Sequence, residues 1–235
     1  MNTTTFTPPP PAPVISPPAD APVGTGPAAL TSWRFRRARV QDADAVIELV
    51  MLIDLHLHPS ETAAAVAPLR RMLAEDQTSN GSLSHGGNHM LVAEGTDGSL
   101  VGVAHCGPAA WMFDDDIVKP FMRRKVLERV ASVNHIAVRG DHRGQDIATN
   151  LLARTEHDLR AAGYAALTLR HDRHLTRFYQ AAGYTSGPTL GLHLPPVGLI
   201  TESARGWRYA VKPLTEQVTF TTMRGTRALT GILPG

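Results

Sequence analysis

Two short stretches of this sequence contain residues whose types and spacing suit chemistry on a phosphorylated ligand. The first is Arg143-Gly144-Gln145-Asp146-Ile147-Ala148, which lies between an apolar run typical of a strand and an amphipathic run typical of a helix. The first N–H groups of a helix lack intrahelical partners and carry a partial positive charge, so they attract anions. Gly144 permits close backbone approach, and Arg143 can add a charge-assisted contact. The residues alone leave a phosphate site and an ordinary basic turn equally open.

The second stretch is Phe178-Tyr179-Gln180-Ala181-Ala182-Gly183-Tyr184, which falls on a predicted helix further along the chain. A phenol with its ordinary pKa of about 10 is protonated at neutral pH, so Tyr179 is suited to donate a proton. The alternative is a core aromatic, because Leu175, Phe178 and Ala182 form an apolar stripe. Tyr179 lies about 100° round the helix from Phe178, so it need not share that stripe.

The elements that must position these stretches follow from the spacing of apolar residues. The expected strands are 33–40, 89–94, 99–106, 132–138, 189–194 and 206–214, and the expected helices are 42–57, 60–76, 120–130 and one starting near Asp146. Asp42 is the expected N-cap of the first helix. This order predicts an α/β (α+β) fold, with a mixed, mostly antiparallel sheet flanked by helices on both faces.

The two ends of the chain differ from the middle in composition. Residues 1–31 are rich in Pro, Thr and Ala with a single charge, Asp20, and we expect a disordered tail there. The run PPPPAP suits a proline-reading module, but a passive tail is the favoured interpretation. The folded domain is expected to span 32–214, and residues 215–235 are expected to form a weakly structured C-terminal tail.

Composition excludes several classes of protein. The 235 residues carry a net charge of only +2, with basic and acidic residues interspersed, which argues against a nucleic-acid partner. The single cysteine, Cys106, rules out an internal disulfide and a Cys-rich zinc site, and its apolar setting predicts a packed core thiol. No run approaches the roughly 18 apolar residues of a membrane span. The N-terminus lacks the pattern of a secretory signal, so a soluble, cytoplasmic protein is expected.

Together the two stretches resemble the acyl-CoA-binding core of the GCN5-related N-acetyltransferases (GNAT). The family pattern Gln/Arg-x-x-Gly-x-Gly/Ala resembles Arg143–Ala148, which follows a family-like strand ending at Val138. The later pattern Phe/Leu-Tyr-x-x-x-Gly-Phe/Tyr resembles Phe178–Tyr184, and RYAVKPL resembles the family's last strand. The element order of about 33–214 fits the family, while the sharp motifs cover only 136–184.

This resemblance implies a function, N-acetyl transfer from acetyl-CoA to a primary amine of a small molecule or peptide. It implies direct attack in a ternary complex, because Cys106 suits a covalent intermediate poorly, and it implies neither a metal nor a membrane partner. Homodimers are common on this fold. Tyr179 would protonate the departing CoA thiolate. The implied cofactor contacts are Ile136, Ala137 and Val138 for the pantetheine arm, Arg143, Gly144, Gln145, Asp146, Ile147 and Ala148 for the pyrophosphate, and Asp172.

Two residues depart from the family pattern. Asp146 stands where the motif has its central glycine, so its side chain would crowd the phosphate and its carboxylate would repel it. Asp146 is also a candidate helix cap, which would compete for the same N–H groups. Asp172 stands where many relatives have Asn. These departures support an alternative function, a non-catalytic acetyltransferase-like domain that binds a ligand or partner.

A base for the acceptor amine is harder to assign. If Ile136 and Val138 border the cofactor cleft, strand alternation places Asn134 and Ser132 on the same side. His135 would then point away, as a core histidine. The expected acceptor contacts are therefore Asn134, Ser132 and His105, which ends the predicted strand 99–106.

Other candidate bases are Glu94 and, near the end of the first helix, Asp54, His56 and His58. Deprotonation through a chain of waters fits the sequence better than any one of them. Substrate choice is expected to reside in the connection 107–131. Its run Asp114–Asp116 is interpreted as a solvated loop or helix cap rather than an amine site.

Overall fold

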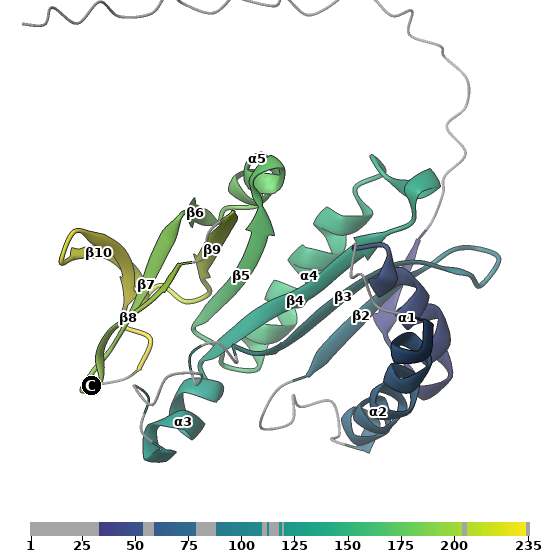
Figure 1. The fold of residues 1–235 in the computed structure, drawn as a ribbon, viewed down its shortest axis with the longest axis horizontal. Coiled ribbons are helices and arrows are strands. Elements are labelled where there is room, and N and C mark those ends of the chain that lie inside the picture. The colour runs from purple at the N-terminus through teal and green to yellow at the C-terminus, as the bar shows by residue number, and fades with distance from the viewer. Residues whose placement is uncertain are drawn as a thin grey trace, which may run out of the picture. The chain divides into compact units, whose positions relative to one another are not determined.

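The computed structural model describes residues 33–53, 59–78, 88–109, 112, 118, 120–203 and 206–233. A seven-stranded sheet forms its centre, in the order β1-β2-β3-β4-β5-β9-β6 (Figure 1). The strands are β1 Arg34–Arg37, β2 His89–Glu94, β3 Leu100–Pro108, β4 Val130–Val138, β5 Ala166–Asp172, β9 Trp207–Pro213 and β6 Thr185–Gly187. All neighbouring pairs are antiparallel except β4 and β5, which confirms the expected mixed, mostly antiparallel sheet.

Helices cover both faces of this sheet, as predicted. The helices are α1 Ala43–Met51, α2 Pro59–Thr78, α3 Pro120–Leu127, α4 Ile147–Ala161 and α5 Thr176–Ala181. In Figure 1, α1 and α2 lie in front of the sheet and α4 behind it. Side chains alternate accordingly, since Val92 and Val103 pack with α1 while Leu91 and Ala104 pack with α4. The first helix was expected to reach residue 57, but α1 ends at Met51.

The parallel pair β4–β5 is short. Its register runs only from Val130 opposite Ala166 to Val133 opposite Leu169. Beyond that point β4 pairs with β3 and β5 pairs with β9, and the two strands diverge (Figure 1). The sheet therefore opens in its middle, beside the turn that leads from β4 to α4.

The C-terminal residues were expected to form a weakly structured tail, and this expectation is wrong. Thr219–Met223 (β10) and Thr226–Thr230 (β11) form a hairpin in a second sheet, in the order β10-β11-β7-β8 with β7 Thr189–Leu194 and β8 Gly198–Ser203. Arg224 and Gly225 both have positive φ, 49° and 77°, as a two-residue type I′ hairpin turn requires. The buried side chains of Leu229 and Ile232 join a core cluster that includes Val130 and Tyr209 of the large sheet.

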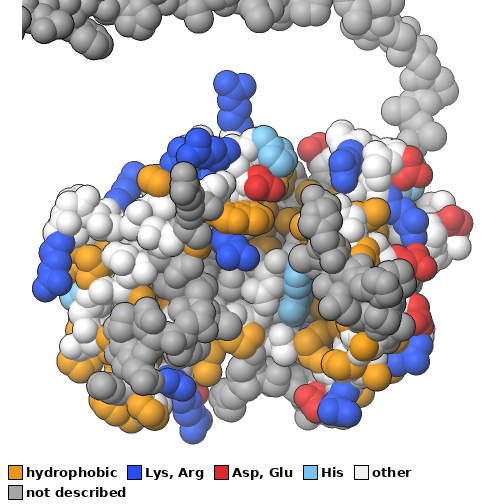
Figure 2. Space-filling view, viewed as in Figure 1, with side chains coloured by type: hydrophobic (Ala, Val, Ile, Leu, Met, Phe, Trp, Pro, Cys, Tyr) orange, Lys and Arg blue, Asp and Glu red, His pale blue; other side chains and the backbone are white. Residues whose placement is uncertain are grey.

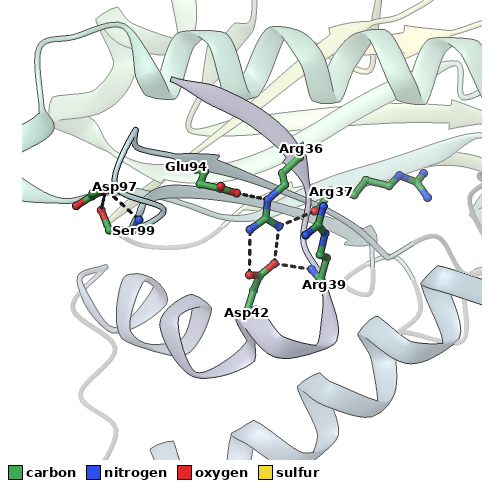
Figure 3. A network of polar contacts seen from close by, with 7 residues as sticks. All are labelled: Arg36, Arg37, Arg39, Asp42, Glu94, Asp97 and Ser99. Carbon is green, nitrogen blue, oxygen red and sulfur yellow. Dashed lines mark hydrogen bonds and ion pairs between the residues drawn. The ribbon is translucent and has the colours of Figure 1, made fainter. Parts of the chain in front are cut away.

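A polar network ties β1 and β2 to the start of α1 (Figure 3). The guanidinium of Arg36 donates from Nη1 to Asp42 Oδ2 at 2.6 Å and from Nη2 to Oδ1 at 3.1 Å, and it also pairs with Glu94. The backbone N–H of Arg39 donates to Asp42 at 2.6 Å. Burial alone would raise the pKa of Asp42, but these hydrogen bonds outweigh it and hold the pKa below its usual value. Asp42 thus begins α1, although its carboxylate bonds backwards to Arg39 rather than into the helix.

Replacement of Asp42 by Ala should lower the free energy of unfolding by about 2 kcal/mol, because a charged, hydrogen-bonded group is removed from a half-buried arginine. The matched control Asp44→Ala removes an exposed ion pair with Arg70 and should cost less than about 1 kcal/mol. The contribution of Asp42 is present above its unfolded pKa and disappears as the pH falls through its lower folded value. Urea unfolding at pH 7 and in acid measures both effects, and equal losses for the two variants would contradict the assignment.

The C-terminal hairpin should be part of the core rather than an appendage. Leu229→Ala should lower the free energy of unfolding by about 2–5 kcal/mol, because it empties a fully buried site. Arg227→Ala, at an exposed position on the same strand, removes only the stacking of its guanidinium on Phe220 and should change it by less than about 1 kcal/mol. Thermal and urea unfolding measure the stability of both variants. A loss for Leu229→Ala as small as that for Arg227→Ala would show that the hairpin does not belong to the core.

Candidate functional site

The turn between β4 and α4 leaves a row of backbone N–H groups without partners. A short 3-10 turn, Gly140–His142, follows β4, and the N–H of Arg143 donates weakly to Gly140 O at 3.4 Å. The first hydrogen bond of the helix runs from Asn150 N–H to Asp146 O at 2.9 Å. Within the described residues, no backbone carbonyl accepts from residues 144–149. These groups stand at the positive end of a fifteen-residue helix, which suits an anion.

Asp146 retains the backbone conformation that a glycine would adopt. Its φ and ψ are 58° and 13°, in the left-handed region, and Gly144 two residues earlier also has a positive φ of 75°. Holding a residue with a side chain in this region costs on the order of 1 kcal/mol. The expectation that Asp146 caps α4 is wrong, because its side chain accepts no capping hydrogen bond and is exposed. The N–H groups of the turn therefore stay free, although a carboxylate lies beside them.

A pocket of about 280 Å³ lies over this turn. It brings together most of the residues predicted for the cofactor, and its lining consists of Val138, His142, Arg143, Gly144, Asp146, Ile147, Ala148, Thr149 and Phe178. Arg143 is exposed, and among the described residues its side chain makes a single long hydrogen bond, from Nε to Val138 O at 3.4 Å. Gln145 does not line the pocket, because its amide bonds back to Asp141 O at 3.4 Å. Phe178, from α5, closes the pocket on the side of the second motif.

Tyr179 is buried against the end of β5. Its ring centroid lies 4.9 Å from that of His171 and 5.8 Å from that of Tyr184, and the side chain is 3% exposed. Burial raises the pKa of Tyr179 to about 12, so the phenol stays protonated at neutral and mildly alkaline pH. His171 is fixed in turn, because its Nδ1 donates to Asp172 O at 2.7 Å and its Nε2 meets Ser186 Oγ at 2.8 Å. The structure thus makes Tyr179 a core aromatic whose ring is packed against His171 and Tyr184.

A β-bulge in β4 changes which side chains share a face. His105 lies opposite His135 and Cys106 opposite Val133, so Asn134 is an extra residue in β4. Ile136 and Val138 pack with α4, whereas Ala137 packs with the α1 cluster. After the bulge the even-numbered residues Ile136 and Val138 face α4, whereas before it the odd-numbered Val133 packs on the α4 side.

The prediction that Asn134 and Ser132 share the side of Ile136 and Val138 is therefore wrong. Asn134 and His135 lie on the same face, because a bulge sets two adjacent residues on one side. That face is also the face of His105, as the stacking of the two histidine rings and the approach of Asn134 Nδ2 to Gly107 indicate. Ile136 and Val138 point the other way, towards α4, so His135 points away from them, as predicted. His135 is half-buried and lies beside Asn134, a residue expected to meet the acceptor.

The remaining predicted residues divide between the site and the framework. Ser132 is buried opposite Thr168, at the last part of the β4–β5 pairing, and Asp172 is exposed at the end of β5. Glu94 is held by Arg36, and Cys106 is fully buried, which confirms a packed core thiol; burial raises its pKa strongly. Asp54, His56, His58 and the run 114–116 lie outside the described residues.

Three residues with close contacts to the site were missed in the sequence. Phe178 was assigned to a core stripe, yet it lines the turn's pocket. His171 carried no pattern of its own in the sequence, and only the end of β5 at Asp172 places it against Tyr179. Asn88 lies just before β2 and accepts from His105, a contact that only the pairing of β2 with β3 creates.

Comparisons with known proteins agree with this geometry. Residues 58–188 match the family model described as acetyltransferase (GNAT) domain. This match covers more than half of the 235 residues, and the chain belongs to the GNAT acetyltransferase family. A sequence comparison with curated proteins gives no match.

Solved structures with the same fold are distant in sequence. One is yncA from Salmonella typhimurium, solved with its cofactor acetyl-CoA, with 17% identity and a TM-score of 0.54 over 80% of this chain and 98% of that one. An N-acetyltransferase from Staphylococcus aureus Mu50 has 17% identity and a TM-score of 0.52 over 79% and 100%. A ribosomal-protein-alanine N-acetyltransferase from Brucella melitensis has 19% identity and a TM-score of 0.52 over 77% and 99%. At these identities the likeness establishes the fold.

The carboxylate of Asp146 should weaken the turn's affinity for CoA. Asp146→Asn removes the charge and should tighten the dissociation constant about three- to fivefold, equivalent to somewhat under 1 kcal/mol. Asp146→Gly should tighten it further, because it also removes the side chain and the left-handed strain. Calorimetric titration with CoA measures both. The control is Asp141→Asn, an exposed carboxylate outside the pocket; if it has the same effect as Asp146→Asn, the change reflects general charge rather than this contact.

Proposed function

We propose that this protein transfers the acetyl group of acetyl-CoA to a primary amine of a small molecule or peptide. The observation that carries the proposal is the turn of residues 143–148, whose glycine-like backbone, exposed arginine and N–H groups, unpartnered from Gly144 onwards among the described residues, surround one pocket. Family membership supports the same reaction class. Direct attack in a ternary complex is the proposed route, because the thiol of Cys106 is fully buried.

The residues present fit an acyl-CoA. The pyrophosphate would lie at the N-terminus of α4, with Arg143 as a charge-assisted donor. The divergence of β4 from β5 leaves the β5-facing edge of Asn134–Val138 without a strand partner, so this edge is the proposed partner of the pantetheine amides. Gln145, Asp172 and the strand residues Ile136–Val138 keep their proposed roles as cofactor contacts. Asp146 is the one group at the turn that opposes the ligand's charge.

Tyr179 is the proposed general acid. When the C–S bond of the thioester breaks, the sulfur leaves as a thiolate that a nearby phenol can protonate. Because burial raises the pKa of Tyr179 to about 12, this acid does not lose its proton at the mildly alkaline pH that favours a neutral amine. The contacts with His171 and Tyr184 hold the ring in one position, which is what proton transfer to a fixed sulfur needs.

The alternative function, a non-catalytic domain with a weakened CoA site, is favoured by one observation, the carboxylate of Asp146 at the phosphate turn. A single experiment separates the two. The protein is incubated with acetyl-CoA and a panel of primary amines and short peptides, and free CoA thiol and acetylated product are both measured. Product formation with an amine supports the enzyme. Binding of CoA by calorimetry with no product from any amine would overturn it in favour of the binding domain.

Tyr179→Phe should lower kcat about 100-fold and leave the KM for acetyl-CoA nearly unchanged, because only the proton donor is lost. The activity that remains should fall more steeply with the basicity of the leaving thiolate than that of the wild type, because no acid protonates the sulfur as it departs. Phe178→Leu serves as a control for packing and should affect the affinity for CoA more than kcat, since Phe178 lines the pocket at the turn. A kcat of Tyr179→Phe within threefold of the wild type would remove the general acid from the mechanism.

A further inference from the structure

The side chain of Arg170 lies at the opening between β4 and β5, on the face of the sheet opposite α4. Leu167 and Leu169 of β5 pack in the core cluster of α4, so the alternate side chains, Thr168 and Arg170, belong to the other face. The last paired position of β4 with β5 is Val133 opposite Leu169. Arg170 is therefore the first residue of β5 beyond the parallel pairing.

The small sheet covers β5 only as far as this arginine. Thr168 is buried, and it lines a small internal cavity together with Leu190 and Leu192 of β7. Arg170, two residues further along the same face, is exposed. The cover that β7 gives to β5 therefore ends between Thr168 and Arg170, and the guanidinium is accessible to a ligand in front of the sheet.

Trp207 of the neighbouring strand β9 holds the guanidinium. The Cζ atom of Arg170 lies 4.8 Å from the centre of the Trp207 ring, and this tryptophan is 40% exposed. A guanidinium held over an indole face is attracted by the ring electrons, and the N–H fork at its edge stays available to a planar anion. Within the described part of the chain, the Arg170 side chain makes no hydrogen bond and no ion pair.

Neutral polar groups face Arg170 across the opening. The bulge of β4 brings Asn134 and His135 to this face, where the ring of His135 stacks on that of His105 at a centroid distance of 5.5 Å. Burial lowers the pKa of both members of this histidine pair, that of His105 to about 4, so the pair is uncharged at neutral pH. Asp172, the next residue of β5 on this face, is exposed and forms no ion pair with Arg170.

The face that carries Arg170 is the one from which an acceptor can approach the proposed thioester. The cofactor pocket at residues 143–148 and the ring of Tyr179 lie on the side of α4. A thioester along the parted edge of β4 therefore leaves its other side to the amine. Figure 2 shows a hollow on this other side, with histidine over β3 and β4 and a basic side chain over β5. An amine in the hollow lies between β4 and the fork of Arg170.

We propose that Arg170 binds a carboxylate of the acceptor, so that the substrate is an amine whose molecule also carries an acid, as an amino acid or an acidic peptide does. This inference rests on the proposed acetyl transfer and narrows its acceptor. Arg170 is the substrate-binding residue, and Trp207 is a positioning residue that holds it.

The chemistry of the fork favours such an acceptor over other amines. The two oxygens of a carboxylate lie in one plane and match two parallel N–H bonds of a guanidinium. An alkylamine leaves the fork without a partner. A diamine brings a second cation towards a fixed positive charge, and this repulsion discriminates against it. The acid group therefore decides between acceptors whose reacting amines are alike.

Binding of the acid group can be measured without turnover. An ω-hydroxy acid carries the carboxylate and has a hydroxyl group in place of the amine, so it occupies the site without reacting. Calorimetric titration of the full-length protein, saturated with CoA, with hydroxy acids of increasing length should find binding. Arg170→Gln should weaken it about 10- to 30-fold, because a charge-assisted hydrogen bond is lost. Equal affinities for the two proteins, or no binding of any acid, would overturn the proposal.

Kinetics with matched acceptors test the specificity. Amino acids with a terminal amine are compared with alkylamines of the same length, and a dipeptide amide with glutamate at its second position is compared with its glutamine counterpart. The two pairs distinguish a free amino acid from a peptide as the source of the carboxylate. The wild type should prefer the acidic member of one pair at least tenfold in kcat/KM. Arg170→Gln should reduce this preference to about threefold or less, mainly through a higher KM, and Arg170→Lys should keep part of it.

Reversal of the charge gives the sharpest variant. Arg170→Glu puts a carboxylate in place of the guanidinium and should shift the preference from acidic amines to diamines, which a role in folding alone would not do. The matched control is Arg154→Gln. Arg154 is also exposed and lies over an aromatic ring, 4.8 Å from the centre of Phe35, but on the α4 side of the sheet. This control should keep the acceptor preference of the wild type.

The outcomes separate this inference from the proposed function. If the wild type acetylates alkylamines as well as their acidic counterparts, or if Arg170→Gln keeps the preference, the role of Arg170 is overturned and acetyl transfer stands. If the wild type acetylates no amine, the proposed function is overturned and this inference falls with it. A preference for acids that Arg170→Gln removes and Arg170→Glu turns towards diamines, at an unchanged melting temperature, would support the proposal.

Discussion

The constraint on which the site depends is the early end of the only parallel pairing in the large sheet. β4 and β5 share four register positions and then part, because β4 remains paired with β3 while β5 remains paired with β9. Beyond that point each of the two strands has its backbone hydrogen-bonded to a neighbouring strand along one edge, and the N–H and C=O groups of its other edge are available to a ligand. The phosphate turn, Tyr179 and the histidine pair all lie around this opening, so their relative positions are set by strand pairing rather than by loops. The paired strands of the sheet therefore hold the site in a fixed geometry.

Asp146 separates two roles that the motif's glycine combines. A glycine there both adopts a positive φ and leaves room for phosphate. This chain keeps the first property at some cost in strain, since Asp146 stays in the left-handed region, and gives up part of the second. The backbone donors are thus in place while the charge around them is reduced. A ligand with weaker electrostatic attraction to this turn exchanges faster, which suits turnover more than storage.

Local patterns predicted most of the large sheet and its helices, because apolar periodicity and turn residues act over a few neighbours. They failed where contacts between residues far apart in the sequence determine the structure. The bulge at Asn134 carries no composition signal, yet it reverses the side-chain parity from His135 onwards. The hairpin β10–β11 has few apolar residues. Its strand β11 is buried by pairing with β7, where Leu229 lies opposite Leu192, more than thirty residues earlier in the chain. The motifs predicted the turn at which the structure has its glycine-like backbone and a pocket, but the contact of His105 with His135 needed the register of β3 with β4.

The pairing of β11 with β7 also constrains the order in which this protein is made. The core cluster that contains Val130 and Tyr209 is closed by Leu229 and Ile232, so it stays open to solvent until those residues have left the ribosome. Contacts of such long sequence separation form late and slowly. The apolar surface that β7 contributes is therefore uncovered from the synthesis of β7 until Leu229 and Ile232 pack on it. A chaperone that recognises exposed β7 can bind the nascent chain only during that interval.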